Sequence, residues 1–445
     1  RDVPAGEIHA GNPAEFIKKR PLGPSTLKGP FRALRLTIVT GPFNALPPAP
    51  CGAMEMVWMG LAHELNRMGH RVTMLSRAYE GSPNQEDRDG IRILRRTQFK
   101  RSRFNKFDLI KDFLYGLRWL AEVPPSDVVV TNTLFLPAMM SISHRNRSKI
   151  NVNMNRFPKR QAWIYLRTHR LAAASGAVAD AVAAQTPLVK RKDLLRVMPN
   201  PIRTDVFTPP SEERNFTSPQ KTIIYTGRIN KEKGLHLLVG AFRILSKDYP
   251  ELKLRLIGPS ALEQGGGGKP YLDKLKKLAE GAAISIEDPI FDREELANAL
   301  RSAHYYCYPS VAYYGEACPV APIEAMATGL VPVVSDLPQF LEYLVPGENG
   351  LVFEREAPDA EAQLASHLKS LIEDPERAIR MGTRAAERAK EFSYRAIASK
   401  FLEDCAELLG IDPSEVFFGA SEAEDDSITE TQSMQPVHQQ EAEAR

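Results

Sequence analysis

Cysteine is scarce in this sequence: the 445 residues include four, at positions 51, 307, 318 and 405. They lie far apart and form no C-x-x-C pair, which argues against a disulfide-stabilised scaffold or a zinc knuckle and favours a reducing cytosol. No H-E-x-x-H motif occurs, and His144, His169 and His304 lack the spacing of metal ligands, so we expect no metal site. No apolar run approaches the roughly 20 residues of a membrane-spanning helix, and no N-terminal stretch is typical of a signal peptide.

The composition is that of an ordinary folded protein. Hydrophobic residues make up 43% of the chain and charged residues 25%, which excludes a wholly disordered chain, collagen and a coiled-coil rod. A length of 445 residues exceeds what one hydrophobic core usually serves, and it predicts two or three domains.

Charge is distributed unevenly along the chain. Residues 31–200 hold 27 Lys and Arg against 12 Asp and Glu, a net charge of +15. Residues 1–30 add +2, so residues 201–445 carry −14 within the formal total of +3. Opposite signs favour two domains with different partners. The basic half suits an anionic partner such as a lipid, a phosphate ester, nucleic acid or a polyanionic glycan, with a solvated basic surface as the alternative.

Two successive α/β units are predicted. In the first, an apolar strand at 34–40, a glycine-bearing loop, a helix at 54–70 and a strand at 71–77 form a βαβ unit, so we expect a parallel sheet. The second unit begins with a strand at 221–228 and continues in the same alternation. Residues 198–220 contain five prolines and little periodicity, as is typical of a linker. We expect a cleft between the two domains.

A pair of cations follows the first strand of the second unit. The strand ends at Gly227, Arg228 follows in the loop, and Lys233 comes immediately before Gly234 and a predicted helix. Cations at the carboxyl edge of a parallel sheet, where a helix begins, suit an anionic phosphate. A strand-end arginine alone is usually a surface residue, but the pair in this context predicts a phosphate site.

A pair of carboxylates occurs later in the same unit. Glu316 and Glu324 are eight residues apart, and we expect Glu324 to begin a helix of small residues that stops at Gly329. One carboxylate is suited to a ribose diol and the other to sugar hydroxyls. Glutamates at this spacing are common and predict little by themselves. Here they occur together with a glycine that ends the helix and a buried strand that follows it, and this combination favours a binding site.

With these elements the chain resembles the retaining glycosyltransferases of the GT-B fold, of the family 4 type, over roughly residues 34–410. The motifs that carry the resemblance are G-R-x4-K-G, a P-S pair before E-x7-E, "EAMATGLVPVV" (Glu324–Val334) and "PGENGLVF" (Pro346–Phe353). The resemblance implies an α/β fold of two Rossmann-like domains that face a central cleft. It also implies that Asp205 and Phe207 lie in the D-x-F pattern of the interdomain segment.

The resemblance also implies roles for individual residues. Arg228 and Lys233 would hold the donor's diphosphate, and Glu316 would contact donor-sugar hydroxyls and Glu324 the ribose. Other residues implied to bind the donor are Gly52, Gly227, Cys318, Pro319 and Val320. The amides Asn132, Asn153 and Asn155 stand where the family usually has a histidine, and we take Asn132 and Asn155 as candidates for the donor sugar or acceptor.

The sequence departs from the family pattern at two further places. Glu316-Ala317-Cys318-Pro319 stands where most members have E-x-F-G, and proline lacks the backbone N–H of glycine. The first-domain G-G turn is Cys51-Gly52, which leaves Gly52 for close approach of the backbone.

The resemblance divides the chain into segments. We predict an N-terminal tail or linker (1–30), an acceptor-binding domain (31–204), a nucleotide-sugar-binding domain (205–392), a helix that crosses back to the first domain (393–418) and an acidic disordered tail (419–445). Residues 1–20 resemble the C-terminal tail of a left-handed β-helix acyltransferase, with a G-N-P-A loop at 11–14. We therefore expect an upstream acyltransferase domain, with a coincidental loop and short helix as the alternative.

Basic and aromatic residues alternate at 91–120, where nine Lys and Arg occur among six aromatics. This pattern favours an anionic membrane surface. The alternative is a helix with core-facing aromatics and solvated cations; single-stranded nucleic acid fits less well, and we expect no nucleic-acid partner. We therefore expect a cytoplasmic protein that lies peripherally at the inner face of the plasma membrane.

Together these features predict a metal-independent retaining glycosyltransferase without a cofactor, whose substrates are a nucleotide-diphosphate sugar, UDP-sugar foremost, and a glycan or lipid-linked acceptor. Two alternatives stay open. One is a sugar-nucleotide epimerase or phosphorylase of the same fold, and the other is a non-catalytic module that binds a sugar nucleotide.

Overall fold

The computed structural model describes residues 31–47, 52–102, 105–143, 147–185, 193–212, 214–218 and 220–417, together with the backbone of 7–10 and 15–19. The chain divides into two compact units, residues 1–151 with 398–445 and residues 152–397. The domain limits given above stay predictions. The predicted acidic tail and the G-N-P-A loop lie outside the described residues. Near the N-terminus, β1 (Glu7–Ala10) pairs with β2 (Glu15–Lys19) in antiparallel fashion.

The first large sheet has eight strands in the order β10-β9-β8-β7-β3-β4-β6-β5. Their bounds are β3 (Arg35–Val39), β4 (Arg71–Arg77), β5 (Gln85–Arg88), β6 (Ile91–Arg96), β7 (Val128–Thr131), β8 (Lys149–Met154), β9 (Arg170–Ala173) and β10 (Leu195–Val197). β3 pairs in parallel with both β4 and β7, as the βαβ pattern predicts.

The expectation of an all-parallel sheet is wrong at one edge, where β5 runs antiparallel to β6. The two strands are joined by Asp89 and Gly90, whose φ angles are 51° and 76°. Two successive positive φ angles in an Asp-Gly pair are typical of the tight turn of a β-hairpin. This dipeptide was visible in the sequence as a hairpin signal.

Helices are associated with the first sheet, and α1 (Ala53–Arg67) lies where the sequence predicts a helix at 54–70. The others are α2 (Asn105–Glu122), α3 (Leu136–Ile142), α4 (Gly176–Ala184) and, near the C-terminus, α12 (Tyr394–Leu409). α1 buries one face against β4 and β6 through residues such as Trp58, Leu61 and Leu65. Among the residues described, no helix is both long and apolar enough to cross a membrane.

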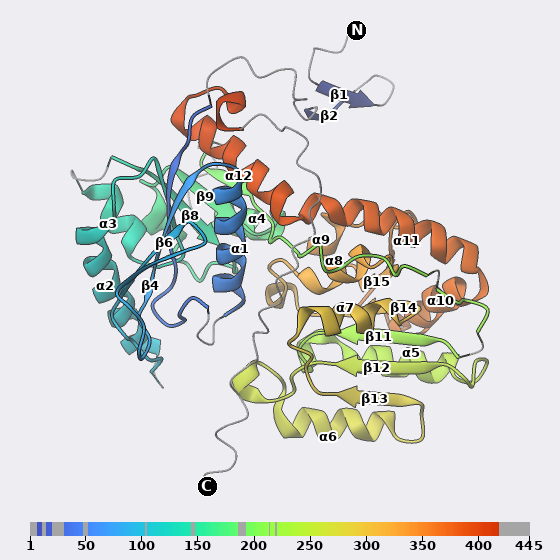
Figure 1. The fold of residues 1–445 in the computed structure, drawn as a ribbon. Coiled ribbons are helices and arrows are strands. Elements are labelled where there is room, and N and C mark those ends of the chain that lie inside the picture. Colours follow the sequence, from blue (N-terminus) through green and yellow to red (C-terminus); the bar gives the residue numbers. More distant parts are fainter. Residues whose placement is uncertain are drawn as a thin grey trace. The chain divides into compact units, whose positions relative to one another are not determined.

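The second large sheet has six strands, all parallel, in the order β13-β12-β11-β14-β15-β16. The strands are β11 (Thr222–Thr226), β12 (Lys253–Ile257), β13 (Ile284–Glu287), β14 (Tyr305–Tyr308), β15 (Pro332–Ser335) and β16 (Leu351–Phe353). Figure 1 shows β11, β12 and β13 side by side. The inner strands β14 and β15 are buried along their whole length, as is typical of parallel strands covered on both faces. The predicted α/β class with parallel sheets is confirmed.

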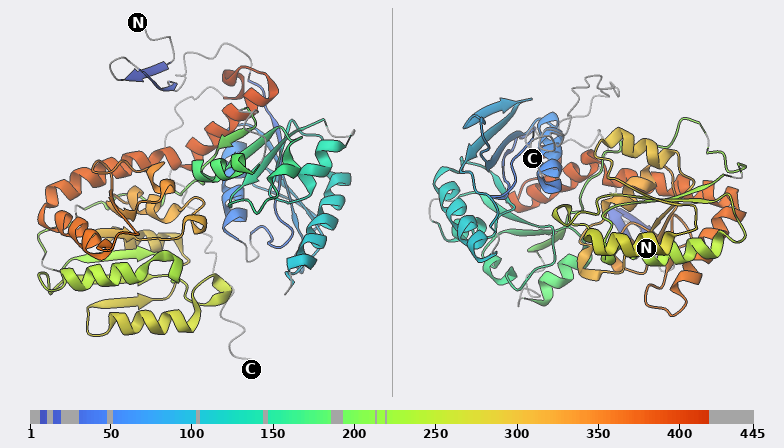
Figure 2. Two further views of the ribbon diagram at one scale, coloured as in Figure 1. Left: turned by 180° about the vertical axis from the view of Figure 1, so that it is seen from behind. Right: turned by 90° about the horizontal axis from the view of Figure 1, so that it is seen from below.

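Helices lie on both faces of this sheet (Figure 2). They are α5 (Leu235–Leu245), α6 (Gly268–Ala279), α7 (Arg293–Arg301), α8 (Val320–Ala327), α9 (Pro338–Leu341), α10 (Ala360–Glu373) and α11 (Pro375–Ala389). Because the strands are parallel, the loops that follow β11, β12 and β14 meet at one edge of the sheet. That edge carries the cations and carboxylates that the sequence singles out.

Candidate functional site

Two glycine-bearing loops meet at the carboxyl edge of the six-stranded sheet. Gly258, after β12, has a φ of 155°, and a Cβ at this position would lie 1.9 Å from the backbone oxygen of Gly227, after β11. Gly267 donates its backbone N–H to the carbonyl oxygen of Ile229 at 2.8 Å. Glycine is therefore required where the two loops touch, and the loop after β12 supports the one that carries the predicted cations.

The turn after β11 fixes the backbone at Lys233. The side chain of Asn230 accepts a hydrogen bond from the backbone N–H of Lys233 at 3.2 Å and caps a short 3-10 helix, η4 (Lys231–Lys233). Gly234 follows with a φ of 64°, and a Cβ there would lie 2.0 Å from the carbonyl oxygen of Pro309. The chain thus turns sharply before α5, and the turn holds Lys233 at the sheet edge.

Lys233 and Glu316 form an ion pair in which each side chain is 4% exposed. The ammonium also lies 5.1 Å from the centre of the Tyr308 ring, within range of a cation–π contact. Burial lowers the pKa of Lys233, the negative charge of Glu316 partly offsets this, and the positive charge of Arg228 lowers the pKa further. The structure therefore brings Lys233 and Glu316 into contact, with Arg228 within electrostatic range.

Arg228 is half-buried beside this pair. Its guanidinium Nη1 lies 3.4 Å from the carbonyl oxygen of Gly265, and the Asn230 amide donates to the same oxygen at 3.1 Å. The hydroxyl of Tyr225 donates to the backbone oxygen of Arg228 at 2.8 Å. The loop after β12 thus holds the arginine side chain, and β11 holds its backbone.

Glu324 is buried on α8 and pairs with the guanidinium of Arg293, the first residue of α7. Burial raises the pKa of Glu324, and Arg293 partly offsets the shift through its charge and its hydrogen bond. α8 begins at Val320, so the expectation that Glu324 begins this helix is wrong by one turn. The carboxylate nevertheless lies on a helix that packs on β14 and β15.

The segment before α8 carries the other predicted donor-binding residues of this unit. Pro319 is the N-cap of α8 and Val320 its first residue. The thiol of Cys318 accepts a hydrogen bond from the backbone N–H of Asn200 at 3.4 Å, and burial raises its pKa to about 12. Cys318 is therefore a neutral thiol with a structural contact, and we assign it no reactivity.

In the first sheet, Gly52 is the N-cap of α1 and makes no side-chain cap. A Cβ at this position would lie 2.5 Å from Oε2 of Glu55, so glycine lets the buried carboxylate lie against the turn. The amide of Asn44 donates to that oxygen at 3.2 Å. Burial raises the pKa of Glu55, and the hydrogen bonds partly offset the shift.

The two asparagine candidates have different surroundings. Asn132, which follows β7, accepts a hydrogen bond from Nε1 of Trp58 at 3.1 Å and donates to the Val39 carbonyl oxygen at 3.3 Å. Asn155, which follows β8, has a buried Oδ1 that no described residue contacts by a hydrogen bond. Asn132 is thus anchored by its neighbours, whereas Asn155 has an acceptor atom left over.

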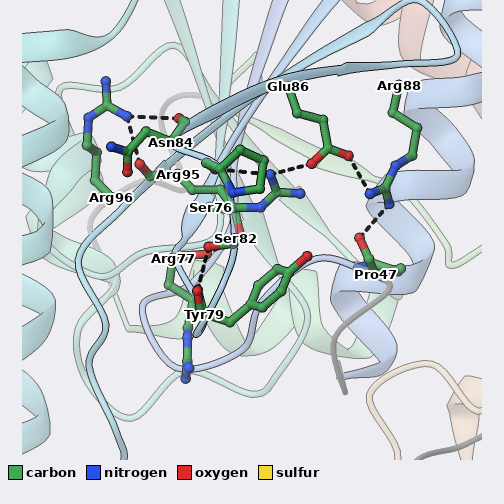
Figure 3. A network of polar contacts seen from close by, with 11 residues as sticks. Pro47, Ser76, Arg77, Tyr79, Ser82, Asn84, Glu86, Arg88, Arg95 and Arg96 are labelled. Atoms are coloured by element: carbon green, nitrogen blue, oxygen red, sulfur yellow. Dashed lines mark hydrogen bonds and ion pairs between the residues drawn. The ribbon is translucent and has the colours of Figure 1, made fainter.

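A network of arginine side chains forms hydrogen bonds with the segment that follows β3 (Figure 3). Arg88 donates to the Pro47 carbonyl oxygen at 2.7 Å and pairs with Glu86, which also accepts from the fully buried Arg95 at 2.7 Å. Arg77, at the end of β4, donates to the carbonyl oxygen of Phe43 in the same loop at 2.9 Å. Part of the basic excess of residues 31–200 therefore has a structural role.

Sequence reasoning missed several residues of the site. The supporting loop contains four consecutive glycines, 265–268, a signal visible in the sequence. Asn230 was visible as a capping residue before a turn. No sequence pattern linked Arg293 to Glu324, because 31 residues separate them and the contact depends on how α7 and α8 pack. In the part of the chain that the structure describes, no group of three His, Cys, Asp or Glu is arranged to hold a metal ion.

Two family models match adjoining parts of the chain. One, described as "Glycosyl transferase 4-like domain", matches residues 52–207, and the other, "Glycosyl transferases group 1", matches residues 209–388. Together the two ranges fall in both predicted units and include every predicted site residue.

Curated relatives share sequence over part of this chain. A phosphatidyl-myo-inositol mannosyltransferase of Mycobacterium tuberculosis is 28% identical over 210 residues, which is 46% of this chain and 52% of that protein. A D-inositol 3-phosphate glycosyltransferase of Corynebacterium efficiens is 31% identical over 186 residues, 40% of this chain and 41% of that protein. The chain thus matches about half or less of the length of these relatives.

Solved structures share the fold more completely. Sucrose-phosphate synthase from Thermosynechococcus elongatus superposes with a TM-score of 0.65 at 18% identity, over 85% of this chain and 99% of that one. A trehalose 6-phosphate synthase from Burkholderia multivorans gives a TM-score of 0.66 at 12% identity, over 85% and 98%. At these identities the likeness establishes the fold.

Proposed function

We infer that this chain belongs to the family 4 glycosyltransferases of the GT-B fold. From this premise we propose that it transfers a sugar from a nucleotide-diphosphate sugar to a glycan or lipid-linked acceptor. The observation that carries the proposal is the contact between Lys233 and Glu316 beside Arg228, at the carboxyl edge of a parallel sheet. A diphosphate needs cations, a sugar needs hydrogen-bond acceptors, and the bond to be broken lies between the two.

The proposed reaction breaks the bond between the anomeric carbon and the diphosphate oxygen. The electron pair goes to the leaving diphosphate, whose charge Arg228 and Lys233 stabilise without a divalent ion. The acceptor hydroxyl attacks the same face of the sugar, and its proton goes to the leaving phosphate oxygen. The anomeric configuration is therefore retained, and no side chain is assigned as general base.

We assign the donor's remaining contacts to the carboxylates and the start of α8. Glu316 accepts hydrogen bonds from sugar hydroxyls, and Glu324 accepts them from the ribose. Because Pro319 has no N–H, the backbone donors on either side of it belong to Cys318 and Val320, and we assign them to the donor's sugar and phosphate. UDP is the nucleotide that we favour for the donor, and the test below also includes GDP- and ADP-sugars.

For the acceptor we propose a molecule with an anionic group, supported by the charge of +15 carried by residues 31–200. The curated relatives are named for phosphatidyl-myo-inositol and D-inositol 3-phosphate, which both carry phosphate. Described cations that the arginine network does not use include Arg147, Arg156, Lys159 and Arg160.

We further propose that α2 docks on an anionic membrane surface, at the inner face of the plasma membrane. The helix buries Tyr115 and Trp119 but exposes six large apolar side chains: Phe107, Leu109, Ile110, Phe113, Leu114 and Leu117. Lys106 and Arg118 are exposed on the same helix. An apolar surface with flanking cations suits lipid chains and anionic headgroups together.

The test is product analysis with UDP-, GDP- and ADP-sugars and phosphate-bearing acceptors, with and without EDTA. We expect transfer with one donor, an anomeric configuration unchanged by proton NMR, and activity that survives EDTA. Conversion of the donor sugar without any acceptor would favour an epimerase instead. Donor binding with no turnover for any acceptor would favour a non-catalytic module.

A further inference from the structure

The contacts of α7 assign a role to Arg293, a residue outside every motif that identified the site. Its guanidinium pairs with the buried Glu324 of α8, and its Cζ lies 4.8 Å from the centre of the Phe207 ring. Arg293 is half-exposed, whereas Glu324 and Phe207 are almost completely buried. The arginine therefore contacts both a buried carboxylate and a buried aromatic ring.

The rest of α7 fixes the position of this arginine. Asp292 caps the helix by accepting a hydrogen bond from the backbone N–H of Glu295 at 2.8 Å. At the other end of the helix, Arg301 donates to the backbone oxygen of Val206 at 2.9 Å. α7 is thus tied to the segment that contains Phe207, and the contact with that ring limits the positions open to the guanidinium.

We propose that Arg293 is a positioning residue that keeps Glu324 ionised and oriented for the ribose of the donor, an inference that rests on the proposed function. A buried carboxylate without a cation becomes protonated or loses its orientation. Arg293 provides the cation from α7, so the hydrogen-bonding capacity of Glu324 depends on a residue that need not touch the donor.

Titratable groups on three neighbouring elements act on Glu324. They include Arg293 of α7, the hydroxyl of Tyr306 on β14 and the hydroxyl of Tyr394 at the start of α12. Burial raises the pKa of both tyrosines, so neither provides a charge near neutral pH. Arg293 is therefore the cation whose removal should change the ionisation of Glu324.

The direction of the effect follows from the burial of Glu324. In Arg293→Gln the offset by the guanidinium is lost, so the pKa of Glu324 rises further above its usual value. The carboxylate then becomes protonated at a higher pH than in the wild type. Binding that needs the carboxylate should weaken as pH falls through that pKa and recover as pH rises.

The test measures the pKa of Glu324 directly by carbon-13 NMR of protein labelled at the glutamate carboxyls, with Glu324→Gln to assign the signal. We expect the pKa to rise in Arg293→Gln, to change less in Arg293→Lys, and to stay unchanged in Arg255→Gln. Arg255 is a matched control because it pairs with Glu287 at 2.7 Å in the same unit, on neighbouring strands. An unchanged pKa in Arg293→Gln would overturn the proposal.

Calorimetric titration with UDP and with inorganic pyrophosphate then connects the pKa to binding. We expect Arg293→Gln to bind UDP about tenfold more weakly at mildly acidic pH, the change that one pKa unit represents, and nearly as tightly as wild type at mildly alkaline pH. Pyrophosphate has no ribose, so its binding should not change. Adding Arg293→Gln to Glu324→Gln should cause no further loss.

A loss of UDP affinity that is independent of pH, or additive with Glu324→Gln, would instead mean that Arg293 contacts the donor itself. If the wild type binds neither UDP nor its GDP and ADP counterparts, the proposed function fails. The NMR comparison still decides in that case whether Arg293 controls the ionisation of Glu324.

Discussion

At the scale of single residues, the site is built on oppositely charged side chains that are paired within the protein. Lys233 and Glu316 are both removed from water, and each compensates the other's charge. Taking two charges out of water costs more than their attraction usually returns, so a buried pair is weak evidence for a stabilising role. A functional role for this pair accounts for its presence at the sheet edge.

Each of the two cations should be needed for the chemical step. We expect Arg228→Ala and Lys233→Met each to lower kcat by about 10²–10³-fold, the usual effect of removing one well-placed charge donor. Lys231→Met is the matched control, because Lys231 lies in the same turn but is exposed. Initial rates at saturating donor test this; equal rates for Lys233→Met and Lys231→Met would contradict it.

Removing Glu316 should leave a buried ammonium without a partner. We expect Glu316→Gln to lower the free energy of unfolding by about 3–5 kcal/mol near neutral pH, and Lys233→Met combined with Glu316→Gln to restore most of it. Burial lowers the folded-state pKa of Lys233 below its usual 10.5. The unfolded chain therefore binds more protons between the two values, and stability rises with pH there.

Loss of Glu316 lowers the pKa of Lys233 further and widens that pH window. The defect of Glu316→Gln should therefore shrink as pH rises toward 10.5. Urea unfolding of the two variants and the wild type across this range measures the effect. A defect that stays constant with pH, or that persists in the double variant, would show that the pair does not control the ionisation of Lys233.

Sequence can indicate which residues lie close together where the order of elements along the chain brings them to one edge of a sheet. Lys233 and Glu316 follow neighbouring strands of a parallel sheet, so their proximity follows from topology. The partner of Glu324 did not follow, because it depends on the packing of two helices. The neutral thiol of Cys318 and the leftover acceptor of Asn155 likewise depend on burial that no spacing reveals.

At the scale of elements, the turn between β11 and α5 determines where Lys233 lies. We expect Gly234→Ala to lower the free energy of unfolding by about 1–3 kcal/mol more than Gly281→Ala does. Both glycines have positive φ, but a Cβ at 281 meets nothing within 4 Å, whereas at 234 it meets a carbonyl oxygen. Urea unfolding of both variants measures the difference. Equal decreases in the free energy of unfolding would mean that the turn at residue 234 accommodates a Cβ without strain.

The exposed apolar side of α2 should be needed for membrane binding and not for donor chemistry. We expect Ile110→Asp combined with Leu114→Asp to abolish co-sedimentation with vesicles containing roughly 30% phosphatidylglycerol, because charges on the apolar side oppose insertion. Both side chains are about half exposed, so folding should persist. Added salt should weaken wild-type binding through screening.

The matched control for that experiment is Leu262→Asp combined with Ile379→Asp, which places charges on exposed apolar residues of the second unit. We expect this variant to bind vesicles as the wild type does. Equal binding by all three proteins would exclude α2 as the docking element, and equal loss in both variants would point to a general effect of charge.

At the scale of the whole molecule, the alternation of strands and helices predicted two α/β units with parallel sheets, and it located elements such as β3, α1, β4 and β11. Periodicity works here because parallel strands are buried along their length and the helices between them are amphipathic. The antiparallel β5 was missed, although Asp89-Gly90 carries its turn signal. The excess of basic residues at 31–200 was visible in the sequence. The sequence did not show that some of these residues, such as Arg95, form ion pairs within the protein.

Above all, we propose that the second unit binds a nucleoside diphosphate through Lys233. Thermal unfolding of the wild type and of Lys233→Met with UDP, GDP and ADP tests it most directly. One nucleotide at 100 times its dissociation constant should stabilise the wild type by about 2.7 kcal/mol and leave Lys233→Met almost unshifted. No shift of the wild type with any of the three, or an equal shift of the variant, would contradict the claim.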